Sequence, residues 1–177
     1  MGGILLPKTS AQTNEPIIYL AGPVLNAPEW QDEAALYILK KEPEMIIATP
    51  RRGIREIIKP YIITEQQDKT RFSRQIAWEQ EHLTKASRKG TILFWLPGMK
   101  EQPDIEGKVY EALTRVEIGQ WMTEYKHNPT IHICFGNDGL SSEIKQTQWY
   151  IQQYAPNKTI HITLEETCDE AIRIAKK

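Results

Sequence analysis

The chain has 177 residues, of which 40% are hydrophobic and 25% are charged, as in a folded globular domain. Lys and Arg number 22 against 23 Asp and Glu, so the sequence lacks the positive charge that favours nucleic-acid polymers or membrane surfaces. Its apolar runs are far shorter than the ~20 residues of a membrane span, and residues 1–13 lack a secretory signal pattern, so we expect a cytoplasmic protein that makes no membrane contact.

The first part of the chain alternates apolar runs with helical patterns. Residues 1–15 are predicted to be a flexible arm. Residues 16–21 lie between prolines and are predicted to be a buried strand. A polar cap, an early proline and an early acid predict a helix over residues 26–41. Residues 45–49 are predicted to be a second strand, and residues 51–64, which Pro60 interrupts, a short helical turn and a loop.

The second part continues this alternation. Apolar side chains at three- and four-residue steps predict a helix over residues 68–87. Residues 91–96 are strongly apolar and are predicted to be a central strand covered on both faces. Residues 97–113 form a long loop rich in Gly, Pro and charge, and loops of this length are commonly functional. The remaining predicted elements are a helix over 114–126, a strand over 130–135, a helix over 141–154, a strand over 159–163 and a helix over 165–177.

This order predicts one α/β domain over residues 16–177, with a doubly wound, mostly parallel, five-stranded sheet. In such sheets ligands bind outside the carboxyl ends of the strands. Glu117 follows the predicted central strand and its loop, so its carboxylate is a candidate for that edge. The alternative is that Thr114 and Glu117 form a capping box at a helix start.

Cysteine and histidine spacing indicates no metal site. The two cysteines, Cys134 and Cys168, form neither a disulfide framework nor a metal-binding spacing, and we expect both to be packing residues. The four histidines also lack metal-ligand spacing.

Three segments together resemble the nucleoside 2-deoxyribosyltransferase-like family. They are residues 18–23 (IYLAGP), residues 75–79 (QIAWE) running into 92–97 (ILFWLP), and residues 114–119 (TRVEIG). Their order and spacing match over about two thirds of the chain. The resemblance implies a flavodoxin-like fold, a homo-oligomer with shared sites, a small nucleoside or nucleotide as ligand, and no metal or organic cofactor. Family members cleave N-glycosidic bonds, and some transfer deoxyribose to another base whereas others hydrolyse nucleoside monophosphates.

The resemblance assigns the nucleophile to Glu117 and contacts with sugar and base to Tyr19, Gly22 and Pro23. A carboxylate beneath the anomeric carbon stabilises an oxocarbenium-like state or forms a glycosyl intermediate. At a helix N-terminus the Glu117 anion would be stabilised by the helix dipole, so we expect it to be ionised at neutral pH. The alternatives are that Tyr19 simply packs in its strand and that Gly22 and Pro23 form an ordinary turn.

Further polar residues are candidates for the base and for a 5′-phosphate. Glu79 is a candidate partner of the leaving base, as are three acids of the long loop, namely Asp104, Glu106 and Glu111, and each is alternatively a surface acid. Arg51, with Arg52, and Arg115 are candidates for binding a phosphate, and the alternative is a solvated surface. Trp78 would either pack in the core or stack on the base.

The sequence departs from the family at one place. Many members carry an Asp at the start of the third strand, where residues 88–91 (RKGT) have no acid. We therefore expect a deoxyribosyl-transferring enzyme that forms a glycosyl intermediate on Glu117. The alternatives are a nucleoside 5′-monophosphate N-glycosidase and a nucleotide-binding module of the same fold without turnover.

Overall fold

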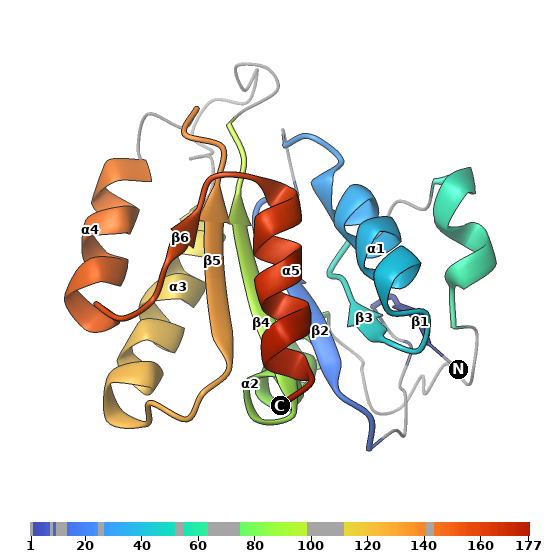
Figure 1. Cartoon of the computed structure of the whole chain (residues 1–177), viewed down its shortest axis with the longest axis horizontal. Coiled ribbons are helices and arrows are strands. Elements are labelled where there is room, and N and C mark those ends of the chain that lie inside the picture. Colours follow the sequence, from blue (N-terminus) through green and yellow to red (C-terminus); the bar gives the residue numbers. More distant parts are fainter. Residues whose placement is uncertain are drawn as a thin grey trace.

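The computed structural model describes residues 2–7, 9, 14–24, 27–51, 55–63, 75–98, 112–140 and 144–177. It contains a six-stranded, all-parallel sheet in the order β1-β3-β2-β4-β5-β6 (Figure 1). The strands are β1 (Gly3–Leu5), β2 (Ile17–Ala21), β3 (Ile46–Ala48), β4 (Gly90–Leu96), β5 (Ile133–Asn137) and β6 (Ile160–His161). The five strands from β3 to β6 in this order have the 2-1-3-4-5 arrangement of flavodoxin-like folds. The predicted fold class is confirmed.

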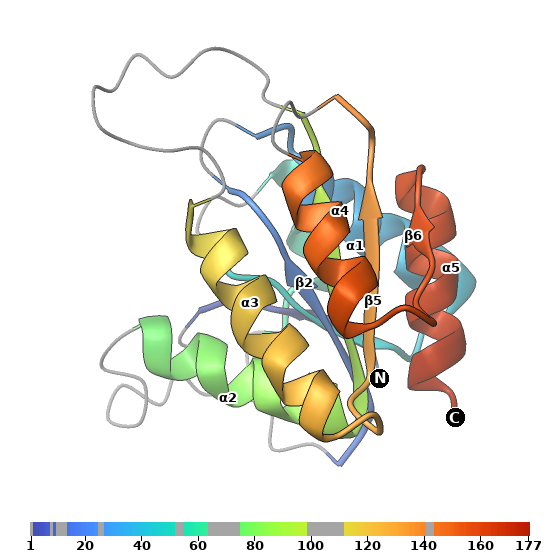
Figure 2. The ribbon, with the colours of Figure 1, turned by 90° about the vertical axis from the view of Figure 1, so that its left-hand side faces the viewer.

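Helices cover both faces of the sheet. One face carries α1 (Trp30–Lys41) and α5 (Leu164–Ala175), and the other carries α2 (Gln75–Arg88), α3 (Ala112–His127) and α4 (Ile144–Tyr154) (Figures 1 and 2). A 3₁₀ turn, η1 (Glu56–Tyr61), lies near β1. All residues of β2, β4 and β5 are buried, because parallel strands covered on both faces have no side exposed to water.

The predicted strand count was too low by one. Residues 3–5, within the predicted flexible arm, form β1, which pairs in parallel with β3. A side chain would not fit at Gly3, because an added Cβ would lie 2.7 Å from the Tyr61 carbonyl oxygen. A short, glycine-containing run has little intrinsic strand preference, so its place depends on these tertiary contacts.

Several element boundaries also differ from the prediction. α3 is described from Ala112, two residues before the predicted start. β5 begins three residues later than predicted, because Asn128 Oδ1 accepts bonds from the Thr130 backbone N–H (3.2 Å) and hydroxyl (2.6 Å) and holds a turn there. β6 has only two residues. The predicted helix residues 68–74 and the loop residues 99–111 lie outside the described part of the chain.

The sheet has a topological switch point between β2 and β4. From β2 the chain crosses to β3 through α1 on one face, whereas from β4 it crosses to β5 through α3 on the other. Right-handed crossovers in opposite directions put these helices on opposite faces, and they leave a crevice at the carboxyl ends of β2 and β4. α2 and α3 lie on the same face of the sheet (Figure 2).

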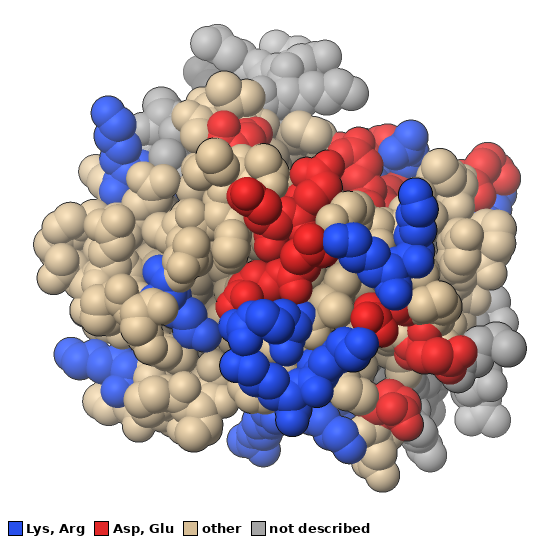
Figure 3. Space-filling view, viewed as in Figure 1, with Lys and Arg blue, Asp and Glu red and all other residues tan. Residues whose placement is uncertain are grey.

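Charges of both signs lie side by side on the α1 and α5 face (Figure 3). Lys41 of α1 forms an ion pair with Asp169 of α5 at 2.6 Å. Glu42 and Lys176, the residues that directly follow these two helices, form a second ion pair at 2.7 Å. Such exposed pairs contribute at most about 1 kcal/mol each. Within the described ranges, no helix has both the length and the apolar character needed to cross a membrane.

Candidate active site

Tyr19, Glu79 and Glu117 converge from β2, α2 and α3. Tyr19 is the central residue of β2, is 1% exposed, and packs in the core between the sheet and the α2 and α3 layer. Its pKa is raised well above the ordinary value, first by burial and then by the negative charges of Glu79 and Glu117. Tyr19 therefore stays protonated at neutral pH, and its hydroxyl remains a hydrogen-bond donor beside two acids.

Glu117 holds its proton more tightly than expected. Burial, and then the charge of Glu79, raise the pKa of the Glu117 carboxyl from 4.5 to about 7. The prediction that the helix dipole keeps Glu117 ionised at neutral pH is not supported, because burial and the charge of Glu79 act in the opposite direction. With a pKa of about 7, Glu117 is partly protonated at neutral pH.

The capping-box alternative is not supported. Thr114 lies inside α3, at its third described residue, and is only 4% exposed. It shares the sheet-facing side of α3 with Ile118 and Trp121, which are also buried. A residue inside the helix cannot act as its N-cap, since the N-cap residue flanks the helix outside helical geometry.

Glu79 is held by a glutamine that the sequence analysis did not single out. Gln75 Nε2 donates to Glu79 Oε1 at 2.6 Å and to the Pro50 carbonyl oxygen at 3.0 Å. Pro50 follows β3, so this contact ties the start of α2 to the carboxyl edge of the sheet. The four-residue spacing of Gln75 and Glu79 on a predicted helix was the sequence signal that could have revealed the pair.

Trp78 is a core residue. It is fully buried, stacks on His82 with ring centroids 4.2 Å apart, and lies 6.2 Å from the Tyr19 ring. Its Nε1–H donates to the Thr9 carbonyl oxygen at 2.7 Å. These contacts occupy the ring within the chain, so Trp78 supports the wall beside Glu79 and offers no face to a base.

Gly22 and Pro23 direct the chain out of β2. A Cβ on Gly22 would lie 2.3 Å from the Trp95 carbonyl oxygen and 2.7 Å from Trp30 Cζ2, so its neighbours within the chain already require a glycine here. The Pro23 carbonyl oxygen accepts bonds from Trp30 Nε1 at 3.0 Å and Gln31 Nε2 at 3.2 Å. Both residues are thus explained by packing against α1 at the switch point, as in the turn alternative.

Arg51 belongs to a separate charge cluster. Its Nη2 donates to Glu29 Oε1 at 2.7 Å, and its Nη1 lies 3.0 Å from Asp32 Oδ2 without hydrogen-bond alignment. Arg55 adds contacts of 3.0 Å to Glu29 and 3.8 Å to Asp32. The Arg51 side chain is only 13% exposed, so the solvated-surface alternative is wrong, and phosphate binding would require breaking these pairs. Arg52 lies outside the described residues.

Arg115 does not face Glu117. Residues two apart on an α-helix lie about 200° apart around its axis. Arg115 instead lines a groove of about 280 Å³ between α3 and α4, with Met122, Tyr150 and Tyr154. The expectation that Arg115 would bind phosphate beside Glu117 is therefore not supported by its position.

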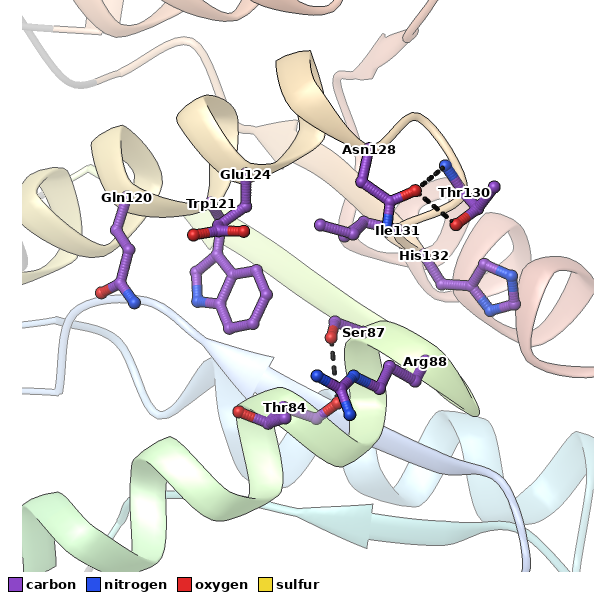
Figure 4. A pocket seen from close by; sticks show the side chains of 10 residues that line it. All are labelled: Thr84, Ser87, Arg88, Gln120, Trp121, Glu124, Asn128, Thr130, Ile131 and His132. Atoms are coloured by element: carbon purple, nitrogen blue, oxygen red, sulfur yellow. Dashed lines mark hydrogen bonds between the residues drawn. The ribbon is translucent and has the colours of Figure 1, made fainter.

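A larger pocket of about 470 Å³ lies at the other edge of the sheet (Figure 4). Trp121 and Gln120 point from α3 toward α2, and Thr84 and Arg88 lie opposite them (Figure 4). His132, just before β5, also lines this pocket, so it adjoins the amino ends of the strands. We place the candidate active site at Tyr19, Glu79 and Glu117 instead, because these three groups influence one another and because Gln75 links Glu79 to Pro50, which follows β3.

His132 and Asp138 both have partners within the chain. His132 Nδ1 lies 2.9 Å from the Gly90 carbonyl oxygen, and both cysteines are buried and free. Asp138 accepts the Gly98 N–H through both carboxylate oxygens, at 3.0 and 2.8 Å. In the described part of the chain, no group of three or more His, Cys, Asp or Glu side chains could hold a metal ion. The loop acids Asp104, Glu106 and Glu111 lie outside that part.

Comparison of the chain with protein-family models, with curated proteins and with solved structures found no match.

Proposed function

We propose that this chain cleaves the N-glycosidic bond of deoxynucleosides and transfers the 2-deoxyribosyl group to another base through a glycosyl intermediate on Glu117. The observation that carries the proposal is a pair of interacting acids, Glu117 and Glu79, beside Tyr19, the buried central residue of β2. The resemblance of the three sequence segments supports the same chemistry.

The reaction has two balanced steps. A Glu117 oxygen bonds to C1′ while the C1′–N bond breaks, and the electron pair of that bond goes to the base nitrogen. The leaving nitrogen takes the proton that Glu79 holds in the reactive state. In the second step another base attacks C1′, releases the Glu117 carboxylate and returns a proton to Glu79, so the configuration at C1′ is retained.

The proposal predicts a pH dependence with a definite direction. The reaction needs one proton on this pair of acids, which Glu79 holds while Glu117 is ionised. The pKa of about 7 for the Glu117 carboxyl, which the negative charge of Glu79 helps to raise, marks the pH at which the pair loses that proton. Activity should therefore fall as pH rises through about 7. Protonated Tyr19 can donate a hydrogen bond to the ionised Glu117 and orient it without neutralising it.

The monophosphate hydrolase is a weaker candidate. Arg51 is held by Asp32 and Glu29, and Arg115 lies in the groove between α3 and α4. Neither arginine therefore supports binding of a 5′-phosphate at the Glu117 cluster.

The test is to incubate the protein with a deoxynucleoside and a different free base, and to follow both bases by chromatography. Glu117→Gln should lower the rate of exchange by roughly a thousandfold or more, because it removes the nucleophile. Glu124→Gln, an exposed residue of the same helix, is the matched control and should leave the rate within about twofold.

Two outcomes would contradict the enzyme. One is the absence of both exchange and released base across the common deoxynucleosides and their monophosphates. The other is full activity in Glu117→Gln. Thermal stabilisation by a nucleotide without any product would instead favour the non-catalytic binding module.

A further inference from the structure

Gly119 lies in the middle of α3 at a position where the described chain has room for a side chain. Glycine inside a helix is less favourable than alanine, because it loses more backbone entropy on folding. Apart from its chain neighbours and the backbone of its own helix, no described atom lies within 4 Å of a Cβ added at Gly119. Packing within the described chain therefore does not require this glycine, whereas it does require Gly22.

The position opens onto the groove between α3 and α4, which lie side by side on one face of the sheet (Figures 1 and 2). Gly119 lines this groove of about 280 Å³ together with Ile118 and Met122, which are each 2% exposed and form its floor. Because Gly119 has no Cβ, a ligand in the groove can approach the α3 backbone closely. An occupant of the groove would account for the glycine.

The α4 wall of the groove is aromatic. Tyr150 lines the groove and is 54% exposed, although neighbouring rings hold it in place. Trp149 packs edge-on against it with centroids 5.3 Å apart, and the Tyr154 centroid lies 6.3 Å away. A tyrosine held in this way loses little conformational freedom on binding, and its ring can stack on another ring. The aromatic wall and the bare backbone opposite it favour a flat ligand.

Polar residues along the groove favour a ligand with a hydrogen-bonding edge. The Gln146 amide offers both a donor and an acceptor, the pair with which glutamine binds the edge of a base. The Thr123 hydroxyl donates to the Gly119 carbonyl oxygen at 2.9 Å, so it offers only acceptor capacity to a ligand. Arg115 is the only charged residue that lines the groove, which therefore offers no acid to a cation. These groups fit a heteroaromatic ring better than a hydrocarbon or a cation.

We propose that the α3–α4 groove binds a free nucleobase, stacked on Tyr150, in contact with the Gly119 backbone and with its edge on Gln146. The site is separate from Glu117, because positions two apart on a helix point about 200° apart around its axis. The choice of a nucleobase rests on the proposed function, in which free bases are both substrate and product. The ring-binding character of the groove does not rest on it.

The experiment uses Met122, on the floor of the groove, as a local reporter. Methionine methyl groups are labelled with ¹³C, and the Met122 signal is assigned by its loss in Met122→Leu. Adenine, hypoxanthine, cytosine and thymine are titrated separately into the ligand-free protein, and at least one should shift this signal in a saturable way. Gly119→Leu fills the groove and should abolish the shift. Tyr150→Ala should raise the half-saturating concentration roughly tenfold, because it removes the stacking surface.

Two variants show whether the loss is specific to the groove. Gln120→Leu places the same side chain at the next position of α3, outside the residues that line the groove, and should leave the Met122 response unchanged. Gly119→Ala adds only a methyl group, which favours the helix, and should raise the half-saturating concentration severalfold without lowering stability to urea. It replaces Gly119→Leu if the larger side chain prevents folding.

The proposal is overturned if none of the four bases shifts the Met122 signal, or if the folded Gly119 variants respond as the wild-type protein does. A Met122 signal that changes with protein concentration in the absence of base would show that a second copy covers the groove, which also overturns it. Failure of the proposed function looks different: a base shifts the Met122 signal, and Gly119→Leu abolishes that shift, while no base exchange is detected.

Discussion

Asp32 is a buried acid and Glu117 a half-buried one, and their charged neighbours differ. Burial is the largest cause that raises the pKa of both Asp32 and Glu117. Arg51 and Arg55 lower the pKa of Asp32 again, whereas Glu29 and Glu33 raise it, and the net shift is upward. Glu117 instead has a second acid, Glu79, beside it, which raises its pKa further.

The difference separates a structural carboxylate from a chemical one. An acid that faces arginines holds segments of the chain together, here the start of α1 and the chain after β3. An acid balanced by an added proton can release that proton near neutral pH, which is what proton transfer and nucleophilic attack require. The predictions below test this contrast, from the largest expected effect to the smallest.

Removing Arg51 should be costly to stability. In Arg51→Met, Asp32 remains 1% exposed but loses its nearest cation, at 3.0 Å. Loss of one partner from a buried ion pair costs about 3–5 kcal/mol. Urea unfolding should show this loss in the free energy of unfolding at pH 7. Asp32→Asn in the same chain removes the uncompensated charge and should recover much of the loss. If Arg51→Met is as stable as the wild-type protein, Asp32 does not depend on its arginines.

Removing the Glu117 charge should have the opposite effect on stability. The folded protein binds the Glu117 proton more tightly than the unfolded chain, so wild-type stability decreases as pH rises from 4.5 to about 7. Glu117→Gln does not titrate. It should therefore match the wild-type protein at pH 4 and exceed its free energy of unfolding by up to about 3 kcal/mol at pH 8.

Urea unfolding at the two pH values measures this difference. Glu124→Gln, on the exposed side of α3, serves as the control and should show no such dependence. A gain in Glu117→Gln that is equal at both pH values would mean that the ionisation of Glu117 has no part in it.

Arg115→Met should have the smallest effect. The side chain lies in the α3–α4 groove, away from Glu117, and Met retains its apolar stem. We expect kcat/KM to change by less than about twofold, with nucleosides and with monophosphates alike. A selective loss of kcat/KM for monophosphates would restore Arg115 to a phosphate-binding role.

Periodicity and turn residues were enough to predict most of the fold. The strands from β2 to β6 and the helices between them follow apolar runs and three- and four-residue spacing, which local sequence carries. β1 was missed because its pairing depends on contacts with β3 and Tyr61, which no local pattern encodes. The capping box was wrong because a Thr-x-x-Glu spacing also occurs inside a helix.

The candidate site was predicted less completely. Resemblance pointed to Tyr19, Glu79 and Glu117, and the structure brings these three together. Arg115 was misplaced because adjacency in sequence was taken for adjacency in space, although positions two apart on a helix diverge. Arg51 was misjudged because Asp32, an acid in the first turn of a helix, gave no sign in the sequence that it would be buried.

The convergence of β2, α2 and α3 also has a consequence for folding kinetics. Tyr19, Glu79 and Glu117 belong to three separate elements, β2, α2 and α3, and the hydrogen bond from Trp78 to Thr9 spans 69 positions in the chain. Contacts between distant parts of a chain form late, since loop closure costs entropy before the contacts compensate for it. During refolding, the circular dichroism signal of the helices should therefore recover before the raised pKa of Glu117 does.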